Sequence, residues 1–162
     1  MYSDSQNLPA HSRIWIYQCS RELTGDEETL IGDETKRFLE SWTAHDKALQ
    51  AGFEIRYHRF LILMIDEKVA GASGCSIDKS VHFIQSIEKK FGLSLMDRMQ
   101  FAYKLNDKVE IVSRNEFEKL FAAGILNQAS IVFNNLLQTK QELDSAWEVP
   151  VRDSWHRQLI GA

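Results

Sequence analysis

The sequence predicts an α+β fold in a single domain spanning residues 1–162. Segments typical of strands, with period-two alternation or continuous apolar character, are interspersed with segments of helical spacing. A length of 162 residues fits one domain, and the content of 44% hydrophobic and 26% charged residues is that of a soluble globular protein. We expect one mixed five-stranded sheet covered by helices, in the order βαβαββαβα, because the hairpin must be antiparallel whereas helical connections allow parallel crossovers.

The first third of the chain is predicted to hold two strands and a helix. Residues 1–12 are polar, and we expect a loosely ordered N-terminal segment there. Residues 13–19 are rich in β-branched and aromatic side chains, which indicates the first core strand. A T-x-x-E capping signal predicts a helix over about 26–44, in which Gly32 is a weak point. Residues 53–66 alternate at first and then become continuously apolar, as a strand does when it enters a covered sheet.

The middle of the chain carries the clearest local signals. Apolar residues recur at helical spacing over 77–91, and Gly92 follows as the stop. Residues 99–111 alternate on either side of Asn106 and Asp107, which supply turn chemistry, so we expect a hairpin. An S-x-x-E capping signal then predicts a helix over 113–124.

The last segment is predicted to hold a strand, a helix and a packed tail. Residues 131–137 are apolar except for the pair Asn134 and Asn135, and a T-x-x-E signal starts a helix over 139–147. The tail carries Trp155 and Leu159 one helical turn apart, so we expect it to pack.

Charge and composition exclude several classes of function. The chain has 19 basic and 23 acidic side chains, a net charge of -4, which disfavours nucleic-acid binding through phosphates. The longest apolar run, residues 60–65, is far too short to cross a membrane, and the polar N-terminus does not resemble a signal peptide. We therefore expect a cytoplasmic protein whose two cysteines, Cys19 and Cys75, are reduced.

The segment VAGASGCSIDKS, residues 69–80, is the main candidate site. Small flexible residues follow an apolar strand and precede a helix start, an arrangement that directs free backbone N–H groups and the Cys75 thiol at one point. We expect this elbow to bind a small anionic ligand or a partner. The ligand-binding residues predicted here are Gly71, Ser73, Gly74, Ser76 and Asp78. Simple capping of the helix by Ser76 and Asp78 is the alternative explanation.

Cys75 is also a candidate catalytic nucleophile, because a helix N-terminus lowers the pKa of a thiol and offers donors to an oxyanion. Such chemistry needs a base. His82 lies about two turns along the helix, on the order of 10 Å away, which is too far for direct contact. His45 and His156 would have to be brought to Cys75 by the fold. The alternative is that Cys75 is a small, semi-buried residue that packs closely at a tight turn.

Nucleotide hydrolysis, metal binding and redox pairing have less support. Gly71 and Gly74 are only three residues apart, and Asp78 stands where a phosphate loop needs a glycine before its lysine, so we do not expect ATP hydrolysis. The five histidines are scattered, and we predict no metal and no cofactor. Cys19 and Cys75 would lie at one sheet edge if the first two strands were parallel neighbours.

The combination of WIYQ, ASGCSID, VFNNL and WEVP-x-x-DSWH resembles, over the whole chain, an uncharacterised bacterial family of about 160 residues. Its members are often labelled ABC-transporter ATPases. An ABC ATPase domain is much longer and contains a phosphate loop and a signature motif, and this chain contains neither. The resemblance therefore implies no substrate, cofactor or catalytic residue.

Three classes of function stay open at this point. The first is a small-ligand or partner-binding protein with its site in GASGCSID. The second is a cysteine-dependent enzyme that transfers acyl or thiol groups through Cys75. The third is a structural interaction protein, which the four tryptophans and nine phenylalanines favour and which is compatible with a homo-oligomer.

Overall fold

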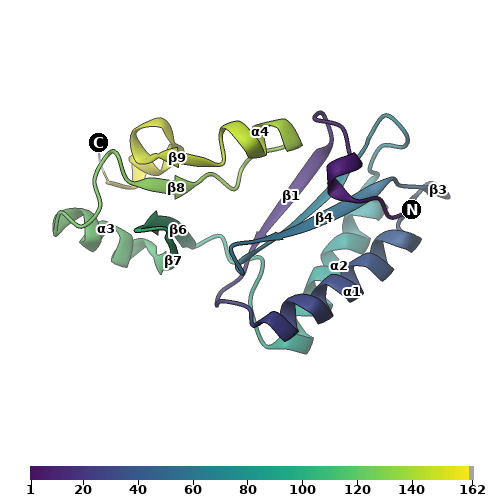
Figure 1. Ribbon diagram of the computed structural model, residues 1–162, viewed down its shortest axis with the longest axis horizontal. Helices are drawn as coiled ribbons and strands as arrows, with labels where there is room; N and C mark the ends of the chain where they lie inside the picture. The colour runs from purple at the N-terminus through teal and green to yellow at the C-terminus, as the bar shows by residue number, and fades with distance from the viewer. Residues whose placement is uncertain (161–162) are drawn as a thin grey trace. The chain divides into compact units, whose positions relative to one another are not determined.

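The structure, a computed structural model that describes residues 1–160, confirms the predicted α+β class (Figure 1). Contacts divide the chain into two compact units. Unit 1 comprises Met1–Met96 and Gln138–Gln141, and unit 2 comprises Asp97–Leu137 and Glu142–Ala162. Each unit has its own sheet and its own apolar core. The prediction of a single domain stays a prediction.

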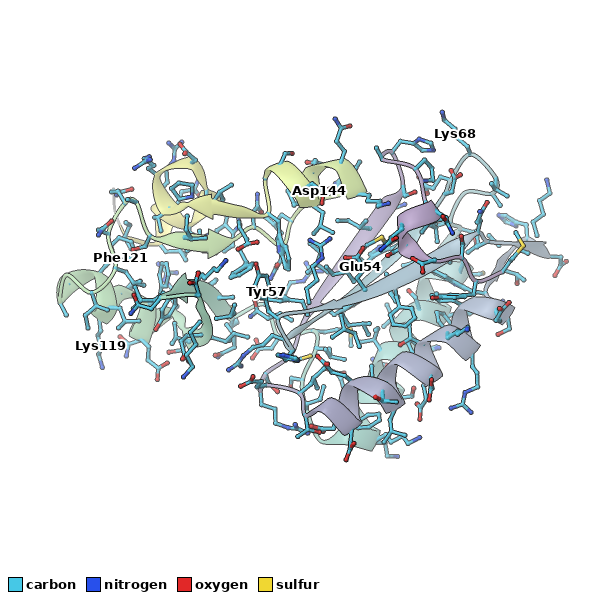
Figure 2. The ribbon with its side chains drawn as sticks, in the orientation of Figure 1. Glu54, Tyr57, Lys68, Lys119, Phe121 and Asp144 are labelled. Carbon is cyan, nitrogen blue, oxygen red and sulfur yellow. The ribbon has the colours of Figure 1, made fainter. Side chains whose placement is uncertain are left out.

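The predicted mixed five-stranded sheet is wrong. The strands that the structure describes form three small sheets in which all pairs are antiparallel. The main cause lies in residues 53–66, which are not one strand but a hairpin of β4 (Ala51–Arg56) and β5 (Phe60–Ile65). Tyr57, which is labelled in Figure 2, and His58 form the turn, with φ of 55° each. These two positions hold neither glycine nor asparagine, the residues that usually mark such a turn in a sequence.

Unit 1 is built on the strand order β1-β5-β4, with β1 at Arg13–Gln18. All six residues of the central strand β5 are buried, which explains its continuous apolar sequence. The helices α1 (Gly25–Ser41) and α2 (Gly74–Phe91) lie on the same side of this sheet (Figure 1). Their core residues pack with alternate residues of β5. The main members of this core are Ile31, Leu39, Leu61, Leu63, Ile65, Ile84 and Ile87.

Both helices predicted for unit 1 are present, although α1 ends at Ser41 and not at the predicted Ala44, which lies in a short strand. Thr24 and Glu27 form the capping box that begins α1, and Gly32 does not interrupt the helix. Gly92 ends α2 in the left-handed conformation, with φ of 62°. A small hairpin of β2 (Thr43–Ala44) and β3 (Lys47–Ala48) follows α1.

The N-terminal segment lies against β4. It contains a short 3-10 helix, Ser5–Asn7, and Tyr2 forms a parallel bridge with Ala51. Gly52 permits this approach, because a Cβ atom there would lie 2.6 Å from the Ser3 carbonyl oxygen. The loose order predicted for residues 1–12 concerns motion, and it stays a prediction.

Unit 2 contains the strand order β7-β6-β8-β9. The predicted hairpin is confirmed as β6 (Gln100–Leu105) and β7 (Lys108–Ser113), with Asn106 and Asp107 at φ of 52° and 63°. The capping box at Ser113 begins α3 (Arg114–Ala122) as expected.

The end of the chain differs in detail from the prediction. Strand β8 (Ile131–Phe133) is short, because the Asn134 side chain accepts a hydrogen bond from the Leu136 amide and turns the chain. Helix α4 (Lys140–Ser145) is followed by an edge strand, β9 (Glu148–Pro150), and an edge is where a proline is tolerated. The predicted packing of the tail is confirmed, since Trp155 and Leu159 lie against the unit 2 core.

Candidate functional site

The elbow of residues 69–80 leads into α2, and two of its serines cap that helix. Ser73 is the N-cap, and its Oγ accepts a hydrogen bond from the Ser76 amide at 3.1 Å. The buried Ser76 hydroxyl accepts from the Ser73 amide at 2.7 Å and donates to the Ser73 carbonyl at 2.8 Å. The cap is therefore Ser73, three residues before the position that the sequence indicates. Capping accounts for both serines.

Several other residues of the elbow face solvent. Gly71, Gly74 and Asp78 are exposed, and a Cβ atom at either glycine would meet nothing within 4 Å. Cys75 is exposed and is a free thiol in the first turn of the helix. No acidic side chain lies in that first turn. The elbow thus presents a thiol and the start of a helix dipole on an open surface.

Among residues 1–160, no hydrogen bond or ion pair joins Cys75 to a histidine. His45 is exposed on the turn between β2 and β3, with φ of 49°. This hairpin begins beside the start of α2, because the Trp42 indole donates to the Ser76 carbonyl at 2.8 Å. No hydrogen bond between His45 and Cys75 is present in the described part of the chain. His156 belongs to unit 2, whereas Cys75 belongs to unit 1.

The parallel arrangement that would bring Cys19 and Cys75 to one sheet edge is wrong. β1 and β5 run antiparallel, and the Cys19 amide donates to the Arg59 carbonyl, at the beginning of β5. Cys75 follows the other end of β5. Burial also raises the pKa of the Cys19 thiol to about 12, although the nearby Arg59 opposes that shift. Cys19 is therefore an inert core residue.

The tail contains a buried polar pair. It folds into two short 3-10 helices, Val151–Asp153 and Trp155–Ile160, with Ser154 between them. The Ser154 hydroxyl and the His156 Nδ1 atom are 2.6 Å apart, and both side chains are buried. Burial lowers the pKa of His156 to about 4, so its ring is neutral at pH 7. The pair anchors the tail, but such a weakly basic ring is poorly suited to activate a hydroxyl as a nucleophile.

Aromatic packing holds this histidine in place. The ring of Trp155 stacks on His156 with centroids 3.9 Å apart. Phe101 and Phe117 contact the same imidazole at about 6 Å between centroids. The backbone of the tail is thus held by packed rings, while Arg152, Asp153, Arg157 and Gln158 are exposed.

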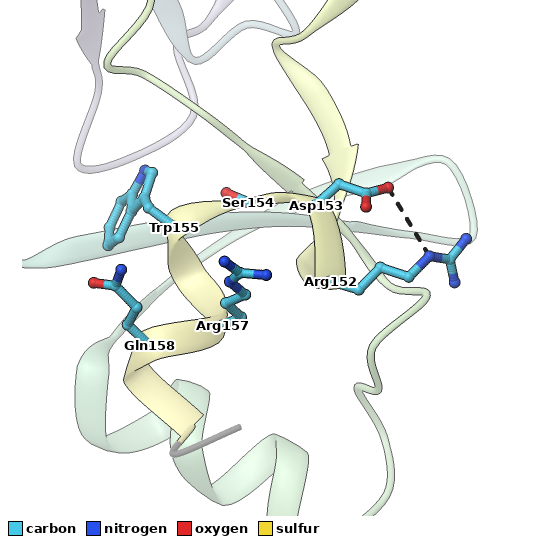
Figure 3. Close-up of a pocket in the computed structure, with 6 residues that line it drawn as sticks. All are labelled: Arg152, Asp153, Ser154, Trp155, Arg157 and Gln158. Atoms are coloured by element: carbon cyan, nitrogen blue, oxygen red, sulfur yellow. Dashed lines mark ion pairs between the residues drawn. The ribbon is translucent and has the colours of Figure 1, made fainter.

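The tail also borders a cavity of about 300 Å³, which we call the tail pocket (Figure 3). Its lining residues are Arg152, Asp153, Ser154, Trp155, Arg157 and Gln158. Arg152 Nε and Asp153 Oδ2 lie 3.9 Å apart, a loose ion pair. No ion pair engages Arg157 within the part of the chain that the structure describes.

Sequence reasoning did not identify the tail pocket. The motif DSWH stands out in the sequence, but only the fold shows that His156 is buried while Asp153 and Arg157 are exposed. Two arginines close together in RDSWHR are the signal that could have indicated an anion site.

Other kinds of site find no support in the structure. Residues 1–160 contain no group of three His, Cys, Asp or Glu side chains arranged to hold a metal ion. None of the helices described is both long enough and apolar enough to span a membrane.

Comparisons of this chain with protein-family models, curated proteins and solved structures give no match. The resemblance to the family of about 160 residues stays a prediction. Any function must therefore be argued from the residues themselves.

Proposed function

We propose that this protein binds a small anionic molecule in the tail pocket. The observation that carries the proposal is that two arginine side chains, Arg152 and Arg157, line one cavity of about 300 Å³. Pockets for small ligands begin at about this volume. An arginine presents up to five N–H donors in a planar fork that matches carboxylate and phosphate oxygens.

The charges of the pocket are incompletely paired. Asp153 lies 3.9 Å from Arg152, which is beyond ordinary hydrogen-bond distance and leaves the Arg152 donors available. Arg157 contributes a second positive charge, so the lining carries two basic groups and one acidic group. A bound anion would satisfy these donors.

Buried side chains hold the backbone that carries the two arginines. Ser154 and His156 are buried at 4% and 1% exposure, and their side chains are bonded to each other. In Figure 3, Trp155 and Gln158 lie on one side of the view and the Arg152–Asp153 pair on the other. A fixed backbone lowers the entropy cost of assembling the site, although the arginine side chains themselves are exposed.

The exposure of the arginines sets the expected strength of binding. Exposed ion pairs contribute about 0.2–1 kcal/mol each, and charge-assisted hydrogen bonds about 1.5–3 kcal/mol. Two such contacts with a small anion predict a dissociation constant on the order of millimolar.

The test is a titration of isotope-labelled protein with inorganic phosphate and with succinate, followed by amide NMR shifts. We expect shifts centred on residues 152–158. Arg157→Gln is expected to weaken phosphate binding about fivefold or more, which corresponds to the loss of roughly 1 kcal/mol. Arg114→Gln is the matched control, since Arg114 is an exposed arginine of the same unit that pairs with Glu118 outside the pocket. Equal binding by the wild type and Arg157→Gln would contradict the proposal.

The start of α2 is a second candidate, favoured by the exposure of the free Cys75 thiol at the first helical turn. As an anion site it predicts phosphate-induced shifts of the amides of Gly74 to Asp78. As the nucleophile of an acyl or thiol transferase, Cys75 should react with iodoacetamide at pH 6, where an ordinary thiol is almost unreactive. A Cys75→Ser variant gives the background rate. Absence of both effects would remove this candidate.

A further inference from the structure

We infer that the ligand of the tail pocket carries hydroxyl groups beside its anionic group, as a sugar phosphate or a hydroxy acid does. The inference rests on the proposed function and adds the chemical class of the ligand. It depends on Asp153, an acidic lining residue that a bare anion does not need.

Asp153 weakens the binding of a purely anionic ligand relative to what the two arginines alone would give. Its carboxylate is exposed, lines the same cavity as both arginines and lies close to Arg152. A phosphate ion that contacts Arg152 also meets this negative charge. Like charges a few ångströms apart repel each other even near a surface.

The same carboxylate is a good partner for hydroxyl groups. An ionised carboxylate has about four lone-pair sites, and the loose pair with Arg152 uses few of them. Gln158 adds one acceptor and two donors to the lining. Hydroxyl groups of a ligand would therefore find acceptors at Asp153 and both kinds of partner at Gln158.

The distribution of charge gives the ligand a direction. Arg157 has no ion pair among the described residues, so it is the stronger anchor for the anionic group. The Arg152–Asp153 pair is nearly neutral, and it suits the uncharged, hydroxylated part of the ligand. The lining thus offers Arg157 to an anionic group and the Arg152–Asp153 pair to hydroxyl groups.

The volume of the cavity agrees with this class. The cavity measures about 300 Å³, which lies at the lower end of the range for pockets that hold small organic ligands. A bare phosphate ion, with five heavy atoms, would leave much of it filled by water. A hexose monophosphate fills more of the space and replaces water at the polar lining.

The experiment compares three probes: inorganic phosphate, a hexose monophosphate and the uncharged hexose. Binding to the wild type, Asp153→Asn, Arg157→Gln and the control Asp107→Asn is followed by NMR or calorimetry. Asp107→Asn removes the same charge at an exposed turn of unit 2, and asparagine tolerates its φ of 63°. Thermal unfolding of each variant confirms that it is folded.

We expect the wild type to bind the hexose monophosphate about fivefold or more tightly than phosphate. One or two added hydrogen bonds account for a difference of this size. Asp153→Asn should weaken hexose monophosphate binding about threefold and strengthen phosphate binding about twofold, because it removes both a strong acceptor and a repulsive charge. If the inference is right, Asp153→Asn changes the affinities for hexose monophosphate and for phosphate in opposite directions.

Failure of the inference and failure of the proposed function give different results. If phosphate binds through Arg157 but the hexose adds no affinity, or if Asp153→Asn changes both probes in the same direction, the hydroxylated ligand class is wrong and the anion site stands. If neither charged probe binds the wild type, both are wrong.

Discussion

The buried histidine of unit 2 makes the stability of the protein depend on pH. In the folded chain, burial lowers the pKa of His156 from 6.5 to about 4. The ring is therefore neutral in the folded state and takes up a proton in the unfolded state when the pH falls below 6.5. Its stabilising contribution is complete above pH 6.5 and is lost as the pH falls from 6.5 to about 4.

The magnitude follows from the difference between the two pKa values. About 2.5 units at 1.36 kcal/mol per unit correspond to a loss of about 3 kcal/mol in the free energy of unfolding. The assay is urea unfolding followed by tryptophan fluorescence at pH 7.5, 6.5, 5.5 and 4.5. Hydrogen exchange of unit 2 amides locates the loss.

His156→Gln is the test variant, because glutamine is neutral and retains hydrogen-bonding groups for Ser154. It should be less stable than the wild type at pH 7.5 and should show a much smaller loss of stability between pH 6.5 and 4.5. His82→Gln, at an exposed position of α2, is the matched control and should keep the wild-type pH dependence. The reasoning would be refuted if His156→Gln and the wild type lost stability in parallel.

The titration of Glu27 falls largely below the pH range in which His156 loses its contribution. Glu27 has its pKa lowered to about 2, mainly by its hydrogen bond with Arg21. Its contribution is present above its ordinary value of 4.5 and is lost as the pH falls from 4.5 to about 2. The decrease assigned to His156 is therefore nearly complete before that of Glu27 begins.

Three further substitutions test the packing of unit 1. Gly32→Ala should raise the free energy of unfolding by about 0.5–1 kcal/mol, measured by urea denaturation, because the position is helical and the new methyl group would make only an ordinary contact of 3.6 Å. Gly52→Ala should destabilise by about 1–3 kcal/mol and increase hydrogen exchange in the N-terminal segment, because its Cβ would lie 2.6 Å from the Ser3 carbonyl oxygen. Trp42→Phe leaves the Ser76 carbonyl without its indole donor, so it should cost about 1–3 kcal/mol in thermal or urea unfolding. An unchanged free energy of unfolding in any one of these variants would contradict the reason given for that substitution.

The elements that the sequence predicts well are those with local chemical signals. Thr24 with Glu27 and Ser113 with Glu116 form capping boxes, in which each side chain bonds to a backbone group three residues away. Gly92 ends α2 in the left-handed conformation that glycine adopts without strain. These interactions span a few residues, so the sequence contains all the information they need.

The pairing of strands was decided by the tertiary structure. The segment 53–66 reads as one strand because both halves are apolar, and its turn uses Tyr57 and His58 in a conformation that neither residue prefers. The hairpin is stabilised instead by burial of the whole of β5 between β1 and β4. Such burial depends on residues far away in the chain and leaves no local signal.

The two candidate sites also differ in how much of each can be recognised from the sequence. From the sequence alone, the elbow at Cys75 is recognisable as the beginning of a helix, because capping and glycine content are local properties. The exposure of Cys75 and the absence of a hydrogen-bonded base among residues 1–160 are known only from the tertiary structure. The tail pocket exists only because His156 is buried against Phe101 and Phe117, which turns Arg152 and Arg157 outward to line one cavity. Local hydrogen bonds are determined by neighbouring residues, whereas a cavity is determined by what the rest of the chain packs beneath it.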